Sequence, residues 1–582
     1  DVQYFRDFYN VDRIEVLKGP NAMIFGRGGG GGIVNRVTKR SSVNQYRQLV
    51  GSVDSFGGVR LTGDFDQPLS ATIGGRLNVM YENGDSFRRH IDLERYAVYP
   101  TVGTMVGSDT RIDLGYEYLH DRRTTDRGVP SRSDGNPLTV DAPIEGRDRT
   151  FFGDPVDSFA NADIHVASLA VEHRLSEGLT LRNRTQYGNY DKFYQNIYPN
   201  AAAQDRDGAG PQPVTVRLAA YNDTTTRKNL FSQTDLIWES NFGGIDQTLL
   251  FGFEFGRQKG HNQRRNGVFS TPMDVPLTDP TVDASVAFTG GGANNGIKTS
   301  VAAAYIQDQI RFTDWLELVA GLRFDRVAID VGNRNSGLNF DRTDELWSPR
   351  LGLIVKPRPN LSLYASYSRS YVPQSGDQFN SLDVTLETLK PERFDNYEMG
   401  AKWEPVEGLL ATAAVYRLDR SNTRAAGPVP GTIVLTGEQR SKGVELGLER
   451  SISADWQISA GYSWQKAEIT ENTTAAPAGR RVPLVPRHSA SLWTRYDFTS
   501  RLGAGLGVIA RSKSYASISN AVKLPGYARV DAALFYEIAD GIEAQLNAEN
   551  IFGADYFPTA HNDNNIAPGA PANVKASVRF GF

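Results

Sequence analysis

The last ten residues of the chain, 573–582, read NVKASVRFGF. Apolar side chains occupy every second position, and the positions between them are polar or glycine. The apolar positions are Val574, Ala576, Val578, Phe580 and Phe582. Because successive side chains of a strand point to opposite faces of a sheet, this pattern predicts a strand with one apolar and one polar face. Residues 361–368 and 543–549 show the same alternation, and helical spacing of apolar residues is not sustained in the sequence.

Segments of this kind recur along the whole chain and predict about 22 strands. The predicted spans are 45–54, 57–67, 72–83, 94–103, 109–119, 164–175, 179–194, 227–239, 246–258, 299–312, 315–328, 347–356, 361–371, 393–404, 408–419, 440–451, 456–467, 487–497, 502–512, 527–537, 542–552 and 574–582.

The connections between these segments alternate between short and long. Residues 104–108 and 176–178 are short connections, for example, whereas 120–163 and 195–226 are long. In an up-and-down meander every second connection lies at the same end, so tight turns gather at one end and long loops at the other. This arrangement is typical of outer-membrane barrels. The predicted fold is therefore all-β, a 22-stranded antiparallel transmembrane β-barrel, since a soluble propeller would require a repeat of about 40–50 residues that the sequence lacks.

The composition excludes several classes of protein. Lys and Arg number 63 and Asp and Glu 67 in 582 residues, a net charge of −4, so no basic field for nucleic acid exists. Cysteine is absent, which excludes disulfides, thiolate metal sites and thiol nucleophiles. The sequence has no run of 18 apolar residues to form a helical membrane span. The mean hydropathy of −0.41 fits a barrel, in which half of each strand faces a wet lumen.

The first 42 residues do not share this texture and are expected to form the C-terminal part of a plug, with the barrel over 43–582. Barrels of about 22 strands have a plugged lumen. Residues 13–18 and 33–39 read as strands on either side of a glycine run at 28–32. The glycines match a dinucleotide fingerprint formally, but a β-branched segment follows them where that fingerprint needs a helix.

Three stretches of the chain resemble TonB-dependent receptors. Residues 11–39 contain VDRIEVLKGP, FGRG and GIVNRVTK, which are similar to the second half of the family's plug. LKPE and NYEMG at 389–400 resemble a mid-barrel signature, and NAENIF with DY at 547–556 resembles one near the C-terminus. The terminal Phe582 on an alternating strand resembles the outer-membrane assembly signal.

Four shorter motifs resemble the catecholate-siderophore branch of that family: DRGVP at 126–130, FGD at 152–154, FYQN at 193–196 and HNDNNI at 561–566. The resemblance implies a receptor, not an enzyme, in the Gram-negative outer membrane, which captures a ferric siderophore and moves it into the periplasm. It also implies energy from the TonB-ExbB-ExbD complex, a monomer among outer-membrane lipid and lipopolysaccharide, and no resident cofactor, because the siderophore carries the iron. A signal peptide, a TonB box and the first half of the plug are expected outside this sequence.

A ferric catecholate is a bulky anion with aromatic rings, so Arg or Lys would supply charge and aromatic side chains would supply stacking surfaces. The candidate ligand-binding residues are Tyr4, Phe8 and Arg27 on the plug, Arg122, Arg123 and Arg127 in the 120–163 loop, Tyr198 and Tyr371 beside long loops, and His561, Asn562 and Asn564 in the last loop. The alternative for each charged residue is a solvated side chain or one paired with a neighbour such as Asp121 or Asp126.

Other functions stay open at this stage. A receptor of the same family for a hydroxamate siderophore, cobalamin or a glycan would share the fold. A passive porin would have about 16–18 strands and no plug. A barrel enzyme is disfavoured because no G-x-S-x-G motif occurs. The seven histidines form no H-E-x-x-H pair, and the Asn/Asp cluster at 562–565 lacks the spacing of an EF-hand calcium loop.

Overall fold

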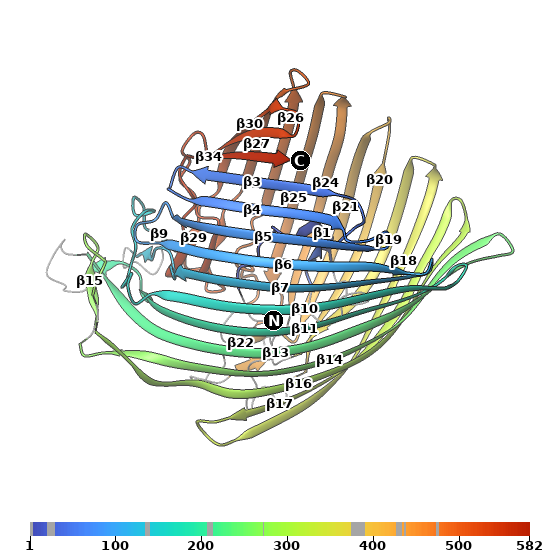
Figure 1. Ribbon diagram of the computed structural model, residues 1–582. Coiled ribbons are helices and arrows are strands. Elements are labelled where there is room, and N and C mark those ends of the chain that lie inside the picture. Colours follow the sequence, from blue (N-terminus) through green and yellow to red (C-terminus); the bar gives the residue numbers. More distant parts are fainter. Residues whose placement is uncertain are drawn as a thin grey trace.

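The computed structural model describes residues 4–19, 30–133, 140–205, 214–271, 273–283, 285–373, 390–426, 433–435, 438–472 and 477–582. Within these residues, 22 long antiparallel strands form a closed barrel (Figure 1). No described helix is long and apolar enough to cross a bilayer.

The barrel strands follow one another in chain order around the ring. They are β3 (Tyr46–Asp54), β4 (Val59–Pro68), β5 (Ile73–Asp85), β6 (Asp92–Val106), β7 (Thr110–Thr124), β10 (Phe159–Ser176), β11 (Leu179–Pro199), β13 (Val214–Phe242), β14 (Ile245–Phe269), β16 (Val286–Thr313), β17 (Leu316–Asn333), β18 (Asn339–Arg358), β19 (Leu361–Val372), β20 (Glu392–Trp403), β21 (Leu409–Ser421), β24 (Gln439–Ser453), β25 (Trp456–Ile469), β26 (His488–Asp497), β27 (Leu502–Arg511), β30 (Tyr527–Ala539), β31 (Ile542–Glu549) and β34 (Asn573–Gly581).

Each predicted strand span coincides with one of these strands, so the predicted fold class is confirmed. The lengths were underestimated at the end that carries the long connections, which we call the outer end. β13, β14 and β16 are 29, 25 and 28 residues long, so much of the loops predicted at 195–226 and 259–298 is strand. On the β14 and β16 extensions polar residues and glycines occupy both faces, which removes the alternation. On β13, Val216, Leu218 and Ala220 do alternate, but they pack into the core of the outer connections and not against lipid, and the prediction missed them.

Alternation along each strand separates a lipid face from a lumen face. On β14, Phe251, Phe253 and Phe255 are exposed on the outside of the barrel. Glu254, which lies between the last two, points inward and forms an ion pair with Arg323. The C-terminal β34 follows the same rule and closes the ring by pairing with β3 from Asp54↔Lys575 to Gln48↔Gly581. Closure leaves no sheet edge exposed to lipid.

The N-terminal segment forms a separate hairpin within the barrel. Its strands are β1 (Val11–Lys18) and β2 (Gly32–Thr38), which pair antiparallel. Burial alone would raise the pKa of the Asp7 carboxyl, but hydrogen bonds and charge from Arg60, 2.6 Å away on β4, hold that pKa below its ordinary value. The hairpin is therefore tied to the wall by ionised groups at neutral pH. The domain boundary at residue 42 stays a prediction.

The connections at the outer end, opposite the tight turns, contain short strands of two to four residues. They are β8 (Ser131–Arg132), β9 (Ala142–Pro143), β12 (Gln204–Asp205), β15 (Asp274–Pro276), β22 (Arg424–Ala426), β23 (Ile433–Leu435), β28 (Ser514–Tyr515), β29 (Lys523–Leu524), β32 (Thr559–Asn562) and β33 (Asn565–Ala567).

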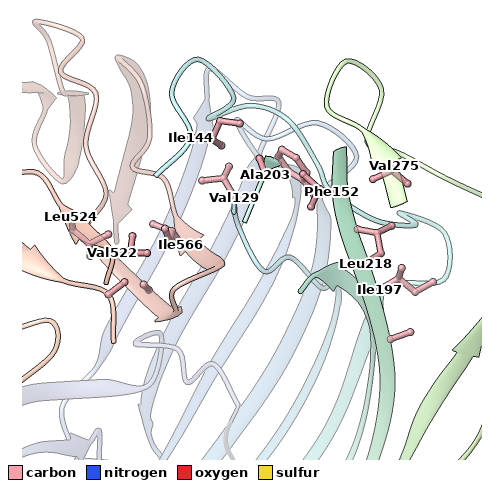
Figure 2. Close-up of a cluster of buried hydrophobic side chains, with 14 residues drawn as sticks. Val129, Ile144, Phe152, Ile197, Ala203, Leu218, Val275, Val522, Leu524 and Ile566 are labelled. Atoms are coloured by element: carbon pink, nitrogen blue, oxygen red, sulfur yellow. The ribbon is translucent and has the colours of Figure 1, made fainter. Parts of the chain in front are cut away.

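Several of these connections share one hydrophobic core, which Figure 2 shows. Val129, Phe152, Val522 and Ile566, from connections far apart in the sequence, and Ile197, at the outer end of β11, are at most 2% exposed. Burying each of these side chains away from water stabilises the fold by about 1.5–3 kcal/mol. The outer connections are therefore packed together as one layer around the mouth of the barrel.

Candidate ligand-binding site

A cavity of about 1530 Å³ lies at the outer end, between the plug, the barrel wall and the last outer connection. We call it the outer cavity. Tyr4 and Phe5 line it from the plug, Tyr194 and Tyr221 from the wall, and His561 from the connection between β31 and β34. Its volume is larger than that of a typical drug-sized pocket, so it can hold a bulky chelate.

Arg127 is the central cation of the outer cavity. Its guanidinium carbon lies 5.4, 5.7 and 5.6 Å from the ring centroids of Tyr194, Tyr198 and Tyr221. It also donates a hydrogen bond to the Tyr221 hydroxyl. The Tyr194 and Tyr221 rings stack with centroids 5.7 Å apart. Three electron-rich rings thus hold the guanidinium in place by cation–π attraction.

Arg127 differs from its neighbours in having no carboxylate partner. Arg123 pairs with Asp121, and Arg264 pairs with Asp223 at 3.2 Å. In the described part of the chain, no carboxylate lies within ion-pair distance of Arg127, and its buried Nε lacks a hydrogen-bond partner. Its charge is therefore available to an anionic ligand.

The carboxylate beside it in sequence is already engaged. Asp126 accepts bonds from the buried Arg88 at 2.6 and 3.1 Å. The alternative considered for Arg127, that its charge is paired with Asp126, does not hold in the described structure. For Arg123, pairing with Asp121 is what the structure shows.

His561 lies in the outer cavity, where nearby arginines affect the pKa of its imidazole. Burial lowers the pKa of its imidazole below the ordinary value, and the charges of Arg127 and Arg264 lower it further. The ring is therefore neutral at pH 7, where it offers a stacking and hydrogen-bonding surface without charge.

Backbone geometry explains why DRGVP and HNDNNI meet at this place. Val129 N donates to Ile566 O at 2.8 Å, and Ile566 N donates to Val129 O at 2.9 Å. Gly128 has a φ of +76°, and a Cβ there would lie 2.0 Å from Ile566 O. Only glycine permits this approach. The bridge brings Arg127 and His561 to the same cavity.

Six of the predicted ligand-binding residues line the outer cavity: Tyr4, Arg123, Arg127, Tyr198, His561 and Asn562. The structure places the others elsewhere. Phe8 is 60% exposed on the plug, with Arg36 6.0 Å from its ring, and Tyr371 packs against a hydrophobic cluster around Val327. Arg27 lies outside the described residues.

Arg122 and Asn564 are separated from the cavity for clear reasons. The predicted start of the loop at residue 120 was wrong, because β7 continues to Thr124. Arg122 therefore lies on the outer face of that strand, on the side opposite Arg123. Asn564 accepts a hydrogen bond from Ser131 at 2.8 Å and joins two outer connections. The amides at 562–565 bond to one another, as Asn562 does to Asn565 at 3.0 Å. No cluster of metal-ligating side chains occurs among the described residues.

Sequence reasoning missed Phe5, Lys192, Tyr194 and Tyr221 as lining residues. Lys192 and Tyr194 lie two residues apart on β11 and inside the predicted span 179–194, so the strand alternation already places both on the same face. Tyr221 fell in a segment predicted to be loop, and no local pattern marks it.

A plugged 22-stranded barrel with a closed outer layer and a ligand-sized cavity is the architecture of an outer-membrane receptor. The chain belongs to the family described as TonB dependent receptor-like, beta-barrel, whose model matches residues 97–551.

Named relatives match along almost the whole chain. It is 28% identical to the metal-pseudopaline receptor CntO of Pseudomonas aeruginosa (strain UCBPP-PA14), over 99% of this chain and 81% of the relative. It is 26% identical to the catecholate siderophore receptor Fiu of Escherichia coli (strain K12), with the same coverage.

Solved structures agree in fold. The crystal structure of the siderophore receptor PiuA from Acinetobacter baumannii superposes with a TM-score of 0.89 at 23% identity, covering 100% of this chain and 88% of that one. The closed form of the ferric-catecholate import receptor Fiu from E. coli K12 superposes with a TM-score of 0.86 at 25% identity, covering 99% and 87%.

Proposed function

We propose that the protein binds a ferric siderophore of the catecholate type in the outer cavity and imports it across the outer membrane into the periplasm. The observation that carries this proposal is Arg127, a cation without a carboxylate partner, held among Tyr194, Tyr198 and Tyr221.

The chemistry of a ferric catecholate matches this arrangement. Its oxygen ligands give the complex multiple negative charges, and Arg127 supplies a desolvated positive charge and free N–H donors for them. Its rings can stack on the tyrosines. A ferric trihydroxamate carries no net charge and no aromatic ring, so it would leave the charge of Arg127 without compensation.

The relatives support this cargo class without agreeing on one cargo. Fiu is named a catecholate siderophore receptor, whereas CntO is named a metal-pseudopaline receptor. The choice for this chain therefore rests on the chemistry of its own cavity. Iron enters as cargo inside the chelate, so we expect no resident cofactor.

Family membership supports coupling to TonB, and we expect the TonB-ExbB-ExbD complex to supply the energy. The lipid-facing side chains support a setting in outer-membrane lipid and lipopolysaccharide. We further expect the receptor to act as a monomer, because the barrel closes on itself and needs no second copy.

The proposal is tested by titrating the purified full-length receptor with a ferric catecholate, a ferric trihydroxamate and cyanocobalamin under identical salt. We expect saturable binding of the catecholate at concentrations at least tenfold lower than for the other two. Equal or tighter binding of the trihydroxamate or cyanocobalamin, or saturation by none of the three, would overturn it.

A further inference from the structure

A row of three lysines crosses neighbouring strands on the outside of the barrel, toward the outer end. Lys228 on β13 lies directly opposite Lys259 on β14, and Lys259 lies directly opposite Lys298 on β16. All three side chains are exposed. Directly opposed residues of an antiparallel pair have Cα atoms about 4.5–5.5 Å apart, so the Cα atoms of all three fall within about 11 Å. We call this row the lysine ladder.

The lysine ladder begins where the lipid-facing apolar surface ends. On β14 the outside of the barrel carries the exposed rings of Phe251, Phe253 and Phe255. Because side chains alternate between the two faces of a strand, the next two positions on the same face are Arg257 and Lys259, and both are exposed. The surface of this strand therefore changes from aromatic to cationic within one step of the alternation.

The neighbouring strands show the same boundary. On β13 the exposed Leu230 is the apolar residue next to Lys228 on the outside of the barrel. On the other side of the ladder, Phe324 of β17 packs beside Trp347 of β18 with ring centroids 4.7 Å apart. Aromatic residues of this kind form the girdle at the membrane interface of outer-membrane barrels. The lysine ladder thus lies at the level of the lipid headgroups of the outer leaflet.

The positive charge of this surface is not neutralised by the described part of the chain. No ion pair there joins Arg257, Lys259 or Lys298 to a carboxylate, although Asp330 on β17 stands opposite Lys298. Glu254 on β14 faces the lumen, where it pairs with Arg323. Like charges that stand directly opposite one another destabilise a sheet. An anion placed between the lysines would remove this repulsion.

A phosphorylated lipid matches both parts of the surface. Its phosphate would accept charge-assisted hydrogen bonds from neighbouring lysines, and the fork of Arg257 would add a bidentate contact. Its acyl chains would lie against Phe251, Phe253 and Phe255, directly below. A free phosphate ion would use only the cationic half of this surface, and an acidic protein would have to displace lipid to reach it. In the outer leaflet, lipopolysaccharide combines phosphate groups with acyl chains in its lipid A part.

We propose that the lysine ladder and Arg257 form a binding site for the phosphate groups of one lipopolysaccharide molecule on the outside of β13, β14 and β16. The opposite face of the same strands carries Tyr221, Arg264 and Asn295, which line the outer cavity. The lipid site therefore lies on the back of the cavity wall. The inference does not depend on which cargo the receptor carries.

The experiment measures binding of bisphosphorylated lipid A to the purified full-length receptor, after detergent washing has removed its native lipid. Native mass spectrometry counts the bound lipid molecules across a titration. The test variant combines Lys228→Gln, Lys259→Gln and Lys298→Gln. Each cation near an anionic lipid surface changes affinity by about fivefold, so we expect the triple variant to bind lipid A at least about tenfold more weakly than wild type.

A matched control removes three cations at the other end of the barrel by combining Arg358→Gln, Lys402→Gln and Arg501→Gln. These side chains are exposed near the tight turns, and none forms an ion pair in the described part of the chain. The control changes the net charge by the same amount, and we expect it to retain the lipid A affinity of wild type. Unchanged binding in the ladder variant, or the same loss in both variants, would overturn the site.

Three further ligands identify the source of the anion. Dephosphorylated lipid A and phosphatidylglycerol should each bind at least about tenfold more weakly than bisphosphorylated lipid A, and millimolar inorganic phosphate should not displace it. Equal binding of dephosphorylated lipid A would show that the phosphates are not recognised. Equal binding of phosphatidylglycerol, or displacement by inorganic phosphate, would overturn the assignment to lipopolysaccharide.

Lys259→Glu separates lipid binding from stability of the barrel. The new carboxylate would stand between Lys228 and Lys298 and relieve the repulsion between like charges. We expect the urea unfolding midpoint of the lipid-free protein to hold or rise, while lipid A binding falls at least about tenfold. A fall in both quantities would identify the lysines as structural, and full lipid A binding would show that the ladder does not bind the phosphates; either result would contradict the proposal.

Discussion

Val129 and Ile566 exchange two backbone hydrogen bonds, of 2.8 and 2.9 Å, although one follows β7 and the other precedes β34. This bridge joins the connections that carry Arg127 and His561. The position of the unpaired cation in the outer cavity thus depends on contact between opposite ends of the sequence.

Replacing Gly128 with alanine should release this bridge. The new Cβ would lie 2.0 Å from Ile566 O, in addition to the cost of about 1–2 kcal/mol for alanine in a left-handed conformation. We expect weaker ferric-catecholate binding and faster protease cleavage of the outer connections on whole cells, with the barrel still folded.

Gly107→Ala is the matched control, because Gly107 has a similar φ of +66° but open space around the added Cβ. If Gly107→Ala weakens binding as much as Gly128→Ala does, the clash at the bridge is not the cause.

Removing the charge of Arg127 should weaken binding strongly. Charge-assisted hydrogen bonds contribute about 1.5–3 kcal/mol, so Arg127→Gln should raise the dissociation constant about 10-fold to 100-fold. Arg122→Gln removes the same charge from the outer face of β7 and should leave affinity within twofold. Isothermal titration with a ferric catecholate measures both, and equal losses would show a general charge effect.

Ligand binding should shift the titration of His561. Its pKa lies below 6.5 in the free protein because of burial and of the charges on Arg127 and Arg264. An anion that offsets those charges raises this pKa, so by linkage its affinity increases as the pH falls from 6.5 through the titration of His561.

The chelate has titrating groups of its own, so the measured quantity is the difference in binding between wild type and His561→Gln from pH 7.5 to 5. We expect the two affinities to separate below pH 6.5, with wild type the tighter binder. A constant ratio across this range would argue against contact between the anion and this corner of the cavity.

The sequence predicted each barrel strand because lipid imposes one apolar face on every membrane-spanning segment, as Phe251, Phe253 and Phe255 illustrate. Above the membrane that constraint ends, and the apolar positions that remain, such as Val216 and Leu218 on β13, pack into the outer connections and not against lipid. Tyr221 therefore escaped prediction, and Arg122 and Arg123 were placed in one loop although strand geometry separates them. The bridge between Val129 and Ile566 is a long-range contact that no local pattern encodes.

Arg323 tests the energetics of the lumen wall. It is 0% exposed and pairs with Glu254 at 2.7 Å and Asp325 at 2.8 Å. Arg323→Met leaves the buried carboxylate of Asp325 without this cation and removes an ion pair from the partly buried Glu254, which should cost about 3–5 kcal/mol of unfolding free energy. Arg311→Met breaks an exposed pair with Asp246 and should cost less than about 1 kcal/mol. Urea unfolding in detergent measures both, and similar midpoints for the two variants would contradict this expectation.

The most direct measurement of the central claim is an anomalous difference map at the iron absorption edge, from crystals of the full-length receptor with a ferric catecholate. The account predicts one iron peak inside the outer cavity, with the chelate against Arg127 and Tyr221 and no protein side chain bound to the metal. An iron peak outside this cavity, an iron coordinated by protein side chains, or no iron peak under saturating chelate would contradict it.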